Sequence, residues 1–303
     1  MSFPADTGVV LVAHGTVDNL DDLPAFVARI RHGRPAPPGL VEELRRRYEA
    51  IGGSSPLLQT TREQAQALSR RLEAPVLVAM RLWEPGVERA LAAASSLGLR
   101  RLVVIALAPF SQHIYWEAAQ KVAVASATGI TLVPSAPYAE EPDFVAAHVD
   151  LIQRHAPEAA AVVLSAHSLP RIAIERGDPY ARLVEGSARA IERSLGRSVT
   201  LCYQSQGADG GEWLGPDVRQ TLTNLAAALP PSSRREIAWA PFGFLADHVE
   251  TLYDLDIEAK SIARELSLEL VRVPALNLHP GLTSALASIA IRSISSICEG
   301  APG

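Results

Sequence analysis

The stretch Val10-Leu11-Val12-Ala13-His14-Gly15 decides the fold, because a similar stretch, Val163-Leu164-Ser165-Ala166-His167-Ser168, occurs about 150 residues later. A second motif repeats in the same order, since Ala108-Pro109-Phe110 returns as Ala240-Pro241-Phe242. Short apolar runs of this kind are typical of strands buried on both faces of a parallel sheet. The two repeated motifs together indicate a duplicated domain.

Eight apolar runs alternate with longer amphipathic segments along the chain. They are expected to be strands at residues 9–13, 75–80, 102–108, 131–133, 161–165, 199–203, 236–240 and 268–273. This alternation predicts an α/β fold with two similar Rossmann-like halves, each a parallel four-stranded sheet flanked by helices. We expect the halves to span residues 1–147 and 148–282. The segment 283–303 is expected to form a helix that packs back on the first half.

The composition is that of an ordinary globular protein, with 303 residues, 48% hydrophobic and 20% charged, and a net charge of −5. Acidic and basic residues are mixed, which argues against nucleic-acid binding. We find no basic-then-apolar leader and no apolar run of about 18 residues, so a cytoplasmic protein without a membrane span is expected. The two cysteines, Cys202 and Cys298, are too few for a four-cysteine iron–sulfur cluster in one chain.

Two histidines occupy equivalent places in the repeat. His14 and His167 both stand where the first strand of their half ends, and ligands of open α/β sheets bind beyond the carboxyl ends of the strands. If the two edges face each other, both histidines line one cleft. A histidine there can bind a metal or accept a proton near neutral pH, although a lone one is more often a hydrogen-bonded structural residue. The repetition favours a functional role.

A dense run of acids follows the second Ala-Pro-Phe motif. If a helix starts near Asp247, the acids Asp247, Glu250, Asp254 and Glu258 fall within an arc of about 80°, whereas Asp256 points away and is expected to be solvated. Like charges aligned in this way repel one another, so the stripe suits a cleft that attracts a divalent cation or carries protons away. Asp247 and Glu250 also match a capping pair at a helix start, and both interpretations stay open.

Several longer motifs, in this order, resemble the ferrochelatase family and extend from about residue 9 to residue 258. They are Arg47-Tyr48-x-x-Ile51-Gly52-Gly53-x-Ser55-Pro56-Leu57, Met80-Arg81-x-x-x-Pro85, Ser165-Ala166-His167-Ser168-Leu169-Pro170, Arg176-Gly177-Asp178-Pro179-Tyr180, Tyr203-Gln204-Ser205, Trp213-Leu214-Gly215-Pro216, and Phe244-x-x-Asp247-His248-x-Glu250-Thr251-Leu252-Tyr253-x-Leu255-Asp256. The resemblance implies two chelatase-type domains with a porphyrin cleft between them. It also implies insertion of Fe(II) into coproporphyrin III or protoporphyrin IX during haem biosynthesis, with release of two protons.

The resemblance assigns roles to particular residues. It implies a catalytic role for His167, Glu250, Asp254 and Glu258. Of these, His167 and Glu250 would also bind the metal. Its porphyrin-binding residues would be His14, Arg31, Ser55, Arg81, Tyr115, Trp213 and Phe244. Fe(II) and porphyrin would be substrates, with no tightly bound cofactor and no iron–sulfur cluster. We expect a monomer that contacts other enzymes of the haem pathway transiently.

Two other functions remain open on this scaffold. The family commonly has Tyr, Met or Asn where His14 stands, and Ala13-His14-Gly15-Thr16 looks instead like the start of sirohydrochlorin chelatases. A cobalt or nickel chelatase for such tetrapyrroles is therefore one alternative, against which the Trp213 motif speaks. A porphyrin or haem carrier is the other. It would need a pocket but no base, so retention of both His167 and Glu250 argues against it.

Overall fold

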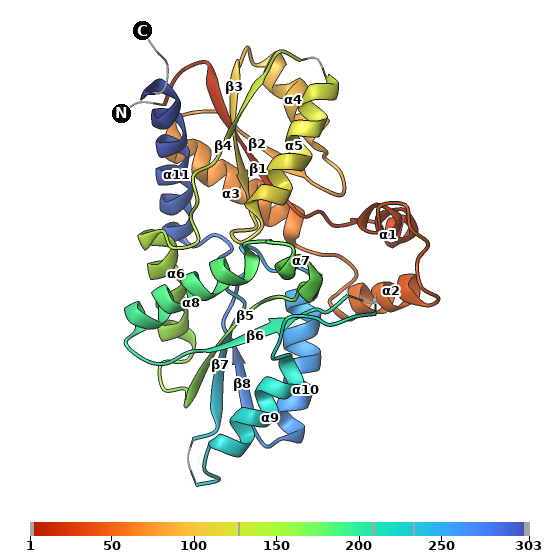
Figure 1. The fold of residues 1–303 in the computed structure, drawn as a ribbon, viewed down its shortest axis with the longest axis vertical. Helices are drawn as coiled ribbons and strands as arrows, with labels where there is room; N and C mark the ends of the chain where they lie inside the picture. The colour runs from red at the N-terminus through yellow and green to blue at the C-terminus, as the bar shows by residue number, and fades with distance from the viewer. Residues whose placement is uncertain (1–2, 127, 208–209, 233, 300–303) are drawn as a thin grey trace.

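The computed structural model describes residues 3–126, 128–207, 210–232 and 234–299 (Figure 1). Its strands form two four-stranded parallel sheets, with the orders β2-β1-β3-β4 and β6-β5-β7-β8. The second sheet thus repeats the topology of the first, which confirms the prediction of two similar α/β halves. Each predicted strand overlaps an observed one: β1 (Thr7–Ala13), β2 (Val76–Met80), β3 (Arg101–Ala106), β4 (Thr131–Pro134), β5 (Ala161–His167), β6 (Thr200–Gln204), β7 (Glu236–Ala240) and β8 (Glu269–Arg272).

Helices connect the strands and cover both sheets. In the first half they are η1 (Leu20–Asp22), α1 (Leu23–Ile30), α2 (Leu40–Ala50), α3 (Leu57–Leu72), α4 (Val87–Ser96) and α5 (Gln112–Ser126). The remaining ones are α6 (Pro142–His155), α7 (Arg171–Glu175), α8 (Tyr180–Leu195), α9 (Val218–Ala228), the π-helix η2 (Thr251–Ala259), α10 (Lys260–Glu265) and α11 (Pro280–Glu299). None of the described helices combines the length and the hydrophobicity that a membrane span requires.

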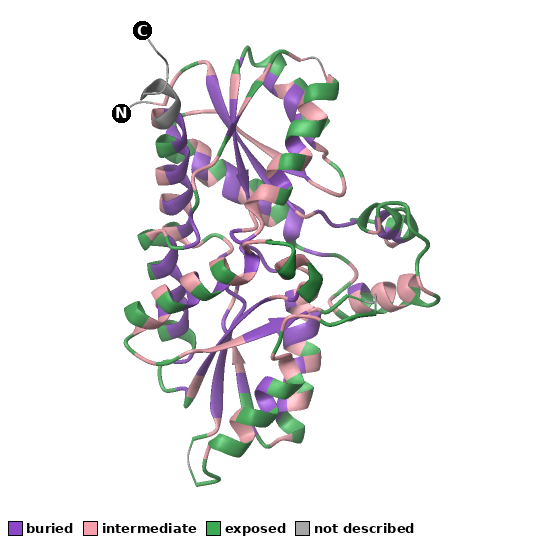
Figure 2. Cartoon of the chain, viewed as in Figure 1, coloured by how far each residue is buried: buried purple, intermediate pink, exposed green. Residues whose placement is uncertain are grey.

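Both faces of each sheet are buried, as the apolar runs predict. Val9 and Leu11 of β1 pack in a core with α3, α6 and α11, whereas Val10 and Val12 face α4 and α5. Successive side chains of a strand point to opposite faces, so a strand covered on both sides needs apolar residues at every position. Figure 2 shows this arrangement, with buried residues along the sheets and exposed ones on the outer helix surfaces.

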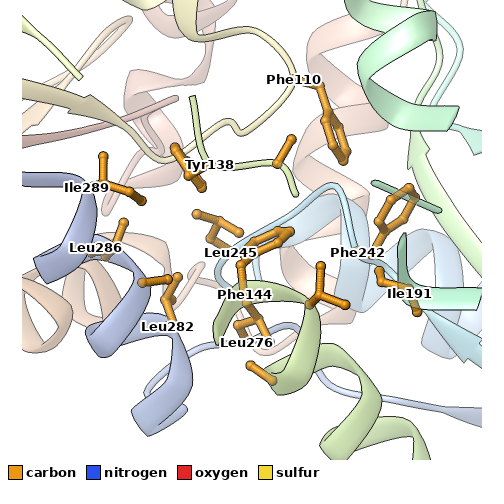
Figure 3. Packing of buried hydrophobic residues seen from close by; sticks show 14 of the residues in the cluster. Phe110, Tyr138, Phe144, Ile191, Phe242, Leu245, Leu276, Leu282, Leu286 and Ile289 are labelled. Atoms are coloured by element: carbon orange, nitrogen blue, oxygen red, sulfur yellow. The ribbon is translucent and has the colours of Figure 1, made fainter. Parts of the chain in front are cut away.

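One apolar core runs through the junction between the halves. Phe110 and Tyr138 from the first half meet Phe242 and Leu245 from the second, and Phe144 of α6 fills the space between them (Figure 3). Helix α11 packs on α3 and α6 and contacts β3 and β4 of the first sheet. The position between residues 147 and 148, expected to divide the halves, lies inside α6, so this helix itself belongs to the junction.

Candidate active site

A cavity of about 360 Å³ lies where the carboxyl ends of the two sheets meet. The loops after β1, β2 and β3 form one wall, and the end of β5 with the segment after β7 forms the other. The polar residues in the lining are His14, Arg81, Ser111 and Tyr115 from the first half and His167, Asp178, Tyr180, His248 and Glu250 from the second. The structure therefore brings the two repeated histidines to one cavity.

His167 and Glu250 form the polar centre of the second-half wall. His167 is the last residue of β5, and its carbonyl accepts a 2.8 Å hydrogen bond from the Tyr180 hydroxyl, which fixes the backbone there. Its Nδ1 lies 3.5 Å from Oε2 of Glu250, and Nε2 of His248 lies 3.7 Å from the same oxygen. Burial opposes ionisation of Glu250, but the histidines around it hold its pKa well below the ordinary range. An ionised carboxylate thus faces two imidazoles.

The helix that carries the acids differs from the expected α-helix. It begins at Val249, two residues after Asp247, and continues as the π-helix η2, which has i→i+5 hydrogen bonds and is a type often found at functional sites. Asp247 does not join the stripe, because Arg272 Nη1 at 2.6 Å and Asn277 Nδ2 at 2.8 Å bind its carboxylate. The interpretation of Asp247 as part of the acidic arc is therefore wrong.

Asp256 is not solvated as expected. Its carboxylate pairs with Arg272 Nε at 2.7 Å and with Lys260 Nζ at 2.7 Å. Arg272 therefore bridges Asp247 and Asp256 and ties the start of the helix to β8. The sequence could not reveal this partner, because Arg272 lies well beyond the acidic run.

Asp254 follows Glu250 along the π-helix. Arg47 Nη1 of α2 donates to its Oδ1 at 2.9 Å, and the Ser205 hydroxyl donates to its Oδ2. Burial, together with the charge of nearby Glu250, raises the pKa of Asp254 to about 7. The charge of Glu258 acts in the same direction, so Glu250, Asp254 and Glu258 are close enough to influence one another. A carboxyl group with this pKa can take up and release a proton near neutral pH.

The first-half wall carries His14, Tyr115 and Arg81. Nδ1 of His14 lies 3.5 Å from the Tyr115 hydroxyl, and the Arg81 guanidinium carbon lies 5.1 Å from the centroid of the Tyr115 ring. Burial and the Arg81 charge lower the pKa of His14 to about 4, so its imidazole is neutral. Within the described residues, Arg81 forms no ion pair, and its buried Nε has no hydrogen-bond partner. This guanidinium is suited to bind a carboxylate of a ligand.

Three residues expected to bind porphyrin do not line this cavity. Arg31 follows α1, and its Nε donates to the Pro35 carbonyl at 2.9 Å. Ser55 is buried before α3, where its Oγ accepts from the Leu57 N–H at 3.4 Å. Trp213 forms an isolated bridge with Pro170. Phe244, by contrast, lines the cavity and packs against His248 with a ring-centroid distance of 5.0 Å.

His248 is a site residue to which sequence reasoning gave no role, as are the lining residues Ser111, Asp178 and Tyr180. His248 lines the cavity next to Glu250. Burial favours the neutral form of His248, but the Glu250 carboxylate outweighs this effect and raises the pKa of His248. The motif Asp247-His248-x-Glu250 could have pointed to His248 from the sequence.

In the described ranges, no group of three or more His, Cys, Asp or Glu side chains could hold a metal ion by itself. His167 and Glu250 are the neighbouring nitrogen and oxygen donors of the second-half wall.

Solved structures of chelatases share the fold. SirB from Bacillus subtilis with Fe3+ superimposes with a TM-score of 0.61 at 15% identity, covering 97% of this chain and 98% of that one. CbiX, described as the terminal enzyme for siroheme biosynthesis in denitrifying bacteria, gives a TM-score of 0.52 at 17% identity and covers 95% of this chain and 98% of its own. The two halves thus share their fold with these chelatases.

Sequence comparisons narrow this class to one family. The ferrochelatase family model matches residues 6–294. A coproporphyrin III ferrochelatase from Geobacillus kaustophilus is 36% identical, with 94% of this chain and 95% of the relative covered. A ferrochelatase from Herpetosiphon aurantiacus is 34% identical, with 94% and 98% covered. The chain belongs to the ferrochelatase family and is a metal chelatase, which confirms the resemblance noted in its motifs.

Proposed function

We propose that this chain inserts Fe(II) into coproporphyrin III in haem biosynthesis. The observation that carries the proposal is the His167–Glu250 contact of 3.5 Å in a cavity shared by both halves. Relatives named coproporphyrin III ferrochelatase support the choice of porphyrin. Arg81, which has no carboxylate partner in the described residues, could bind a carboxylate of either porphyrin. Arg81, Tyr115 and Phe244 would contact the porphyrin, because all three line the cavity.

In the proposed reaction, His167 and Glu250 act as a unit. Metal insertion removes two protons from pyrrole nitrogens, and a base held against the N–H group assists this step. With Nδ1 of His167 turned toward Glu250, the other ring nitrogen, Nε2, is available to accept a proton. The ionised Glu250 carboxylate stabilises the imidazolium that forms. Imidazole and carboxylate are also ligands that Fe(II) accepts, so the same pair could deliver the metal.

Asp254 and Glu258 would carry the proton onward from this pair. Asp254 is the next acid along η2, and burial together with the Glu250 charge raises its pKa to about 7, so it can accept a proton near neutral pH and release it again. Glu258 lies one step farther along the helix and is half-buried. The path would thus run along the helix from Glu250 in the cavity through Asp254 to Glu258. The expectations of no tightly bound cofactor and of a cytoplasmic monomer stay predictions.

The test is anaerobic Fe(II) insertion, followed by absorbance, with coproporphyrin III and protoporphyrin IX offered separately. We expect turnover with coproporphyrin III to be faster, and the reverse order would replace the proposed substrate by protoporphyrin IX. His167→Ala should still bind porphyrin but lose insertion, whereas His155→Ala, which alters an exposed histidine of α6, should behave like the wild type. Porphyrin binding without insertion by the wild type would indicate a carrier. Activity only with cobalt or nickel and sirohydrochlorin would indicate the other chelatase class.

A further inference from the structure

The duplication places an imidazole from each half against the same cavity. The central strands β1 and β5 occupy the same position in the two sheets, and each delivers a histidine at its carboxyl end, His14 directly after β1 and His167 as the last residue of β5. Both histidines line the cavity. The proposed reaction releases two protons, whereas the mechanism described above provides an imidazole base for only one of them. His14 is therefore a basic group of the cavity that the mechanism above does not use in proton transfer.

Only one ring nitrogen of His14 has a hydrogen-bond partner among the described residues. Nδ1 lies 3.5 Å from the Tyr115 hydroxyl, and Tyr115 is itself buried under the Arg81 guanidinium. No hydrogen bond engages Nε2 of His14 among the residues that the structure describes. If Nδ1–H donates to the Tyr115 oxygen, Nε2 carries the free lone pair. The arrangement matches that of a catalytic histidine, in which a hydrogen bond at one nitrogen sets the tautomer of the other.

Burial, and then the charges that face His14, keep its ring neutral. After burial, the Arg81 charge lowers the pKa of His14 most. Positive charge on His248 and His167 also lowers this pKa, whereas the negative charge of Glu250 raises it. His14 is thus unprotonated at neutral pH, and its low pKa makes it a weak base before substrate binds. A substrate carboxylate that pairs with Arg81 would offset the charge that, after burial, lowers the pKa of His14 most, and would make His14 more basic. Binding of a carboxylated porphyrin would in this way improve the base that the reaction needs.

We propose that His14 is a second general base, which takes one pyrrole proton while His167 takes the other. This inference rests on the proposed function. Two N–H bonds break, and each leaves its electron pair on a pyrrole nitrogen that then binds the metal. One proton goes to Nε2 of His14 and the other to Nε2 of His167. Iron stays Fe(II), so no oxidant or reductant is required.

The experiment compares two substitutions in the anaerobic insertion assay. His14→Gln keeps a polar group near Tyr115 but supplies no base, and we expect kcat to fall by about 100-fold or more while the dissociation constant for metal-free porphyrin is unchanged. His14→Ala opens space for an added base, so imidazole should restore turnover in proportion to its concentration. A series of substituted imidazoles should restore it according to their pKa. His155→Ala, assayed with the same imidazoles, controls for their binding to iron.

The outcomes separate this inference from the function on which it rests. Loss of kcat with intact porphyrin binding, followed by rescue with imidazole, supports the second base. A wild-type kcat in His14→Gln, or no rescue of His14→Ala by any imidazole while porphyrin binding is intact, overturns it and leaves the proposed function standing. If the wild type inserts no iron into any porphyrin, the proposed function fails, and the second base fails with it.

Discussion

Asp254 offers the sharpest test of the electrostatics of this site, through the substitution Asp254→Asn. Asp254 is only 5% exposed, and burial with the Glu250 charge raises its pKa from 3.8 to about 7. At about 1.36 kcal/mol per pKa unit, this rise disfavours the ionised folded state by roughly 4 kcal/mol. The folded state keeps a proton that the unfolded chain has lost, so the stability of the wild type falls as the pH rises from about 4 to about 7.

The asparagine removes this penalty but leaves Arg47 with a weaker acceptor, which costs about 1–3 kcal/mol. We therefore expect Asp254→Asn to be more stable than the wild type by about 1–3 kcal/mol at pH 8 and no more stable at pH 5. Insertion of iron should be slower, because a proton acceptor is lost. The measurement is guanidinium unfolding at both pH values, with Asp22→Asn, which alters an exposed acid of η1, as the control. An equal stability difference at both pH values would refute the reasoning.

Three further predictions follow from single contacts. Arg272→Met removes the guanidinium between two carboxylates and should destabilise the fold by about 3–5 kcal/mol in chemical unfolding; a loss near zero would contradict the importance of that bridge. Gly243→Ala would place a Cβ 2.9 Å from the Cβ of Ala166, so we expect a loss of about 1–3 kcal/mol and slower insertion, with wild-type behaviour in both assays as the contrary result. Arg81→Gln should raise the pKa of His14, which NMR of the His14 ring measures, and should weaken binding of carboxylated porphyrins. An unchanged pKa would show that the Arg81 charge does not influence the imidazole.

Much of the fold could be predicted because its signals are local. A parallel strand covered on both faces must be apolar at nearly every position, so β1 and β5 stand out as Val- and Leu-rich runs without any knowledge of their partners. The repeated order of these runs then predicted two sheets of one topology. The strand-end positions of His14 and His167 predicted that each lies at the carboxyl edge of its sheet. That the two edges face each other was a condition of the predicted cleft, and the structure meets it.

Parts of the site escaped prediction because they depend on partners remote in the chain. The spacing of acids made Asp247 and Glu250 look equivalent, yet Arg272 and Asn277 bind Asp247. Helical periodicity assumed an α-helix, whereas η2 is a π-helix. Arg31, which the resemblance assigns to porphyrin binding, follows α1 and is not part of the cavity lining.

The sequence by itself determined the α/β class, the duplication, the family and the two histidines at the strand ends. These features depend on the order and period of residues along the chain, which are present before any packing occurs. Only the tertiary structure decided the protonation preferences of the site: Arg47 and Glu250 around Asp254, and Arg81 beside a neutral His14. A pKa depends on burial and on charges within a few ångströms, and folding brings those charges together from distant segments.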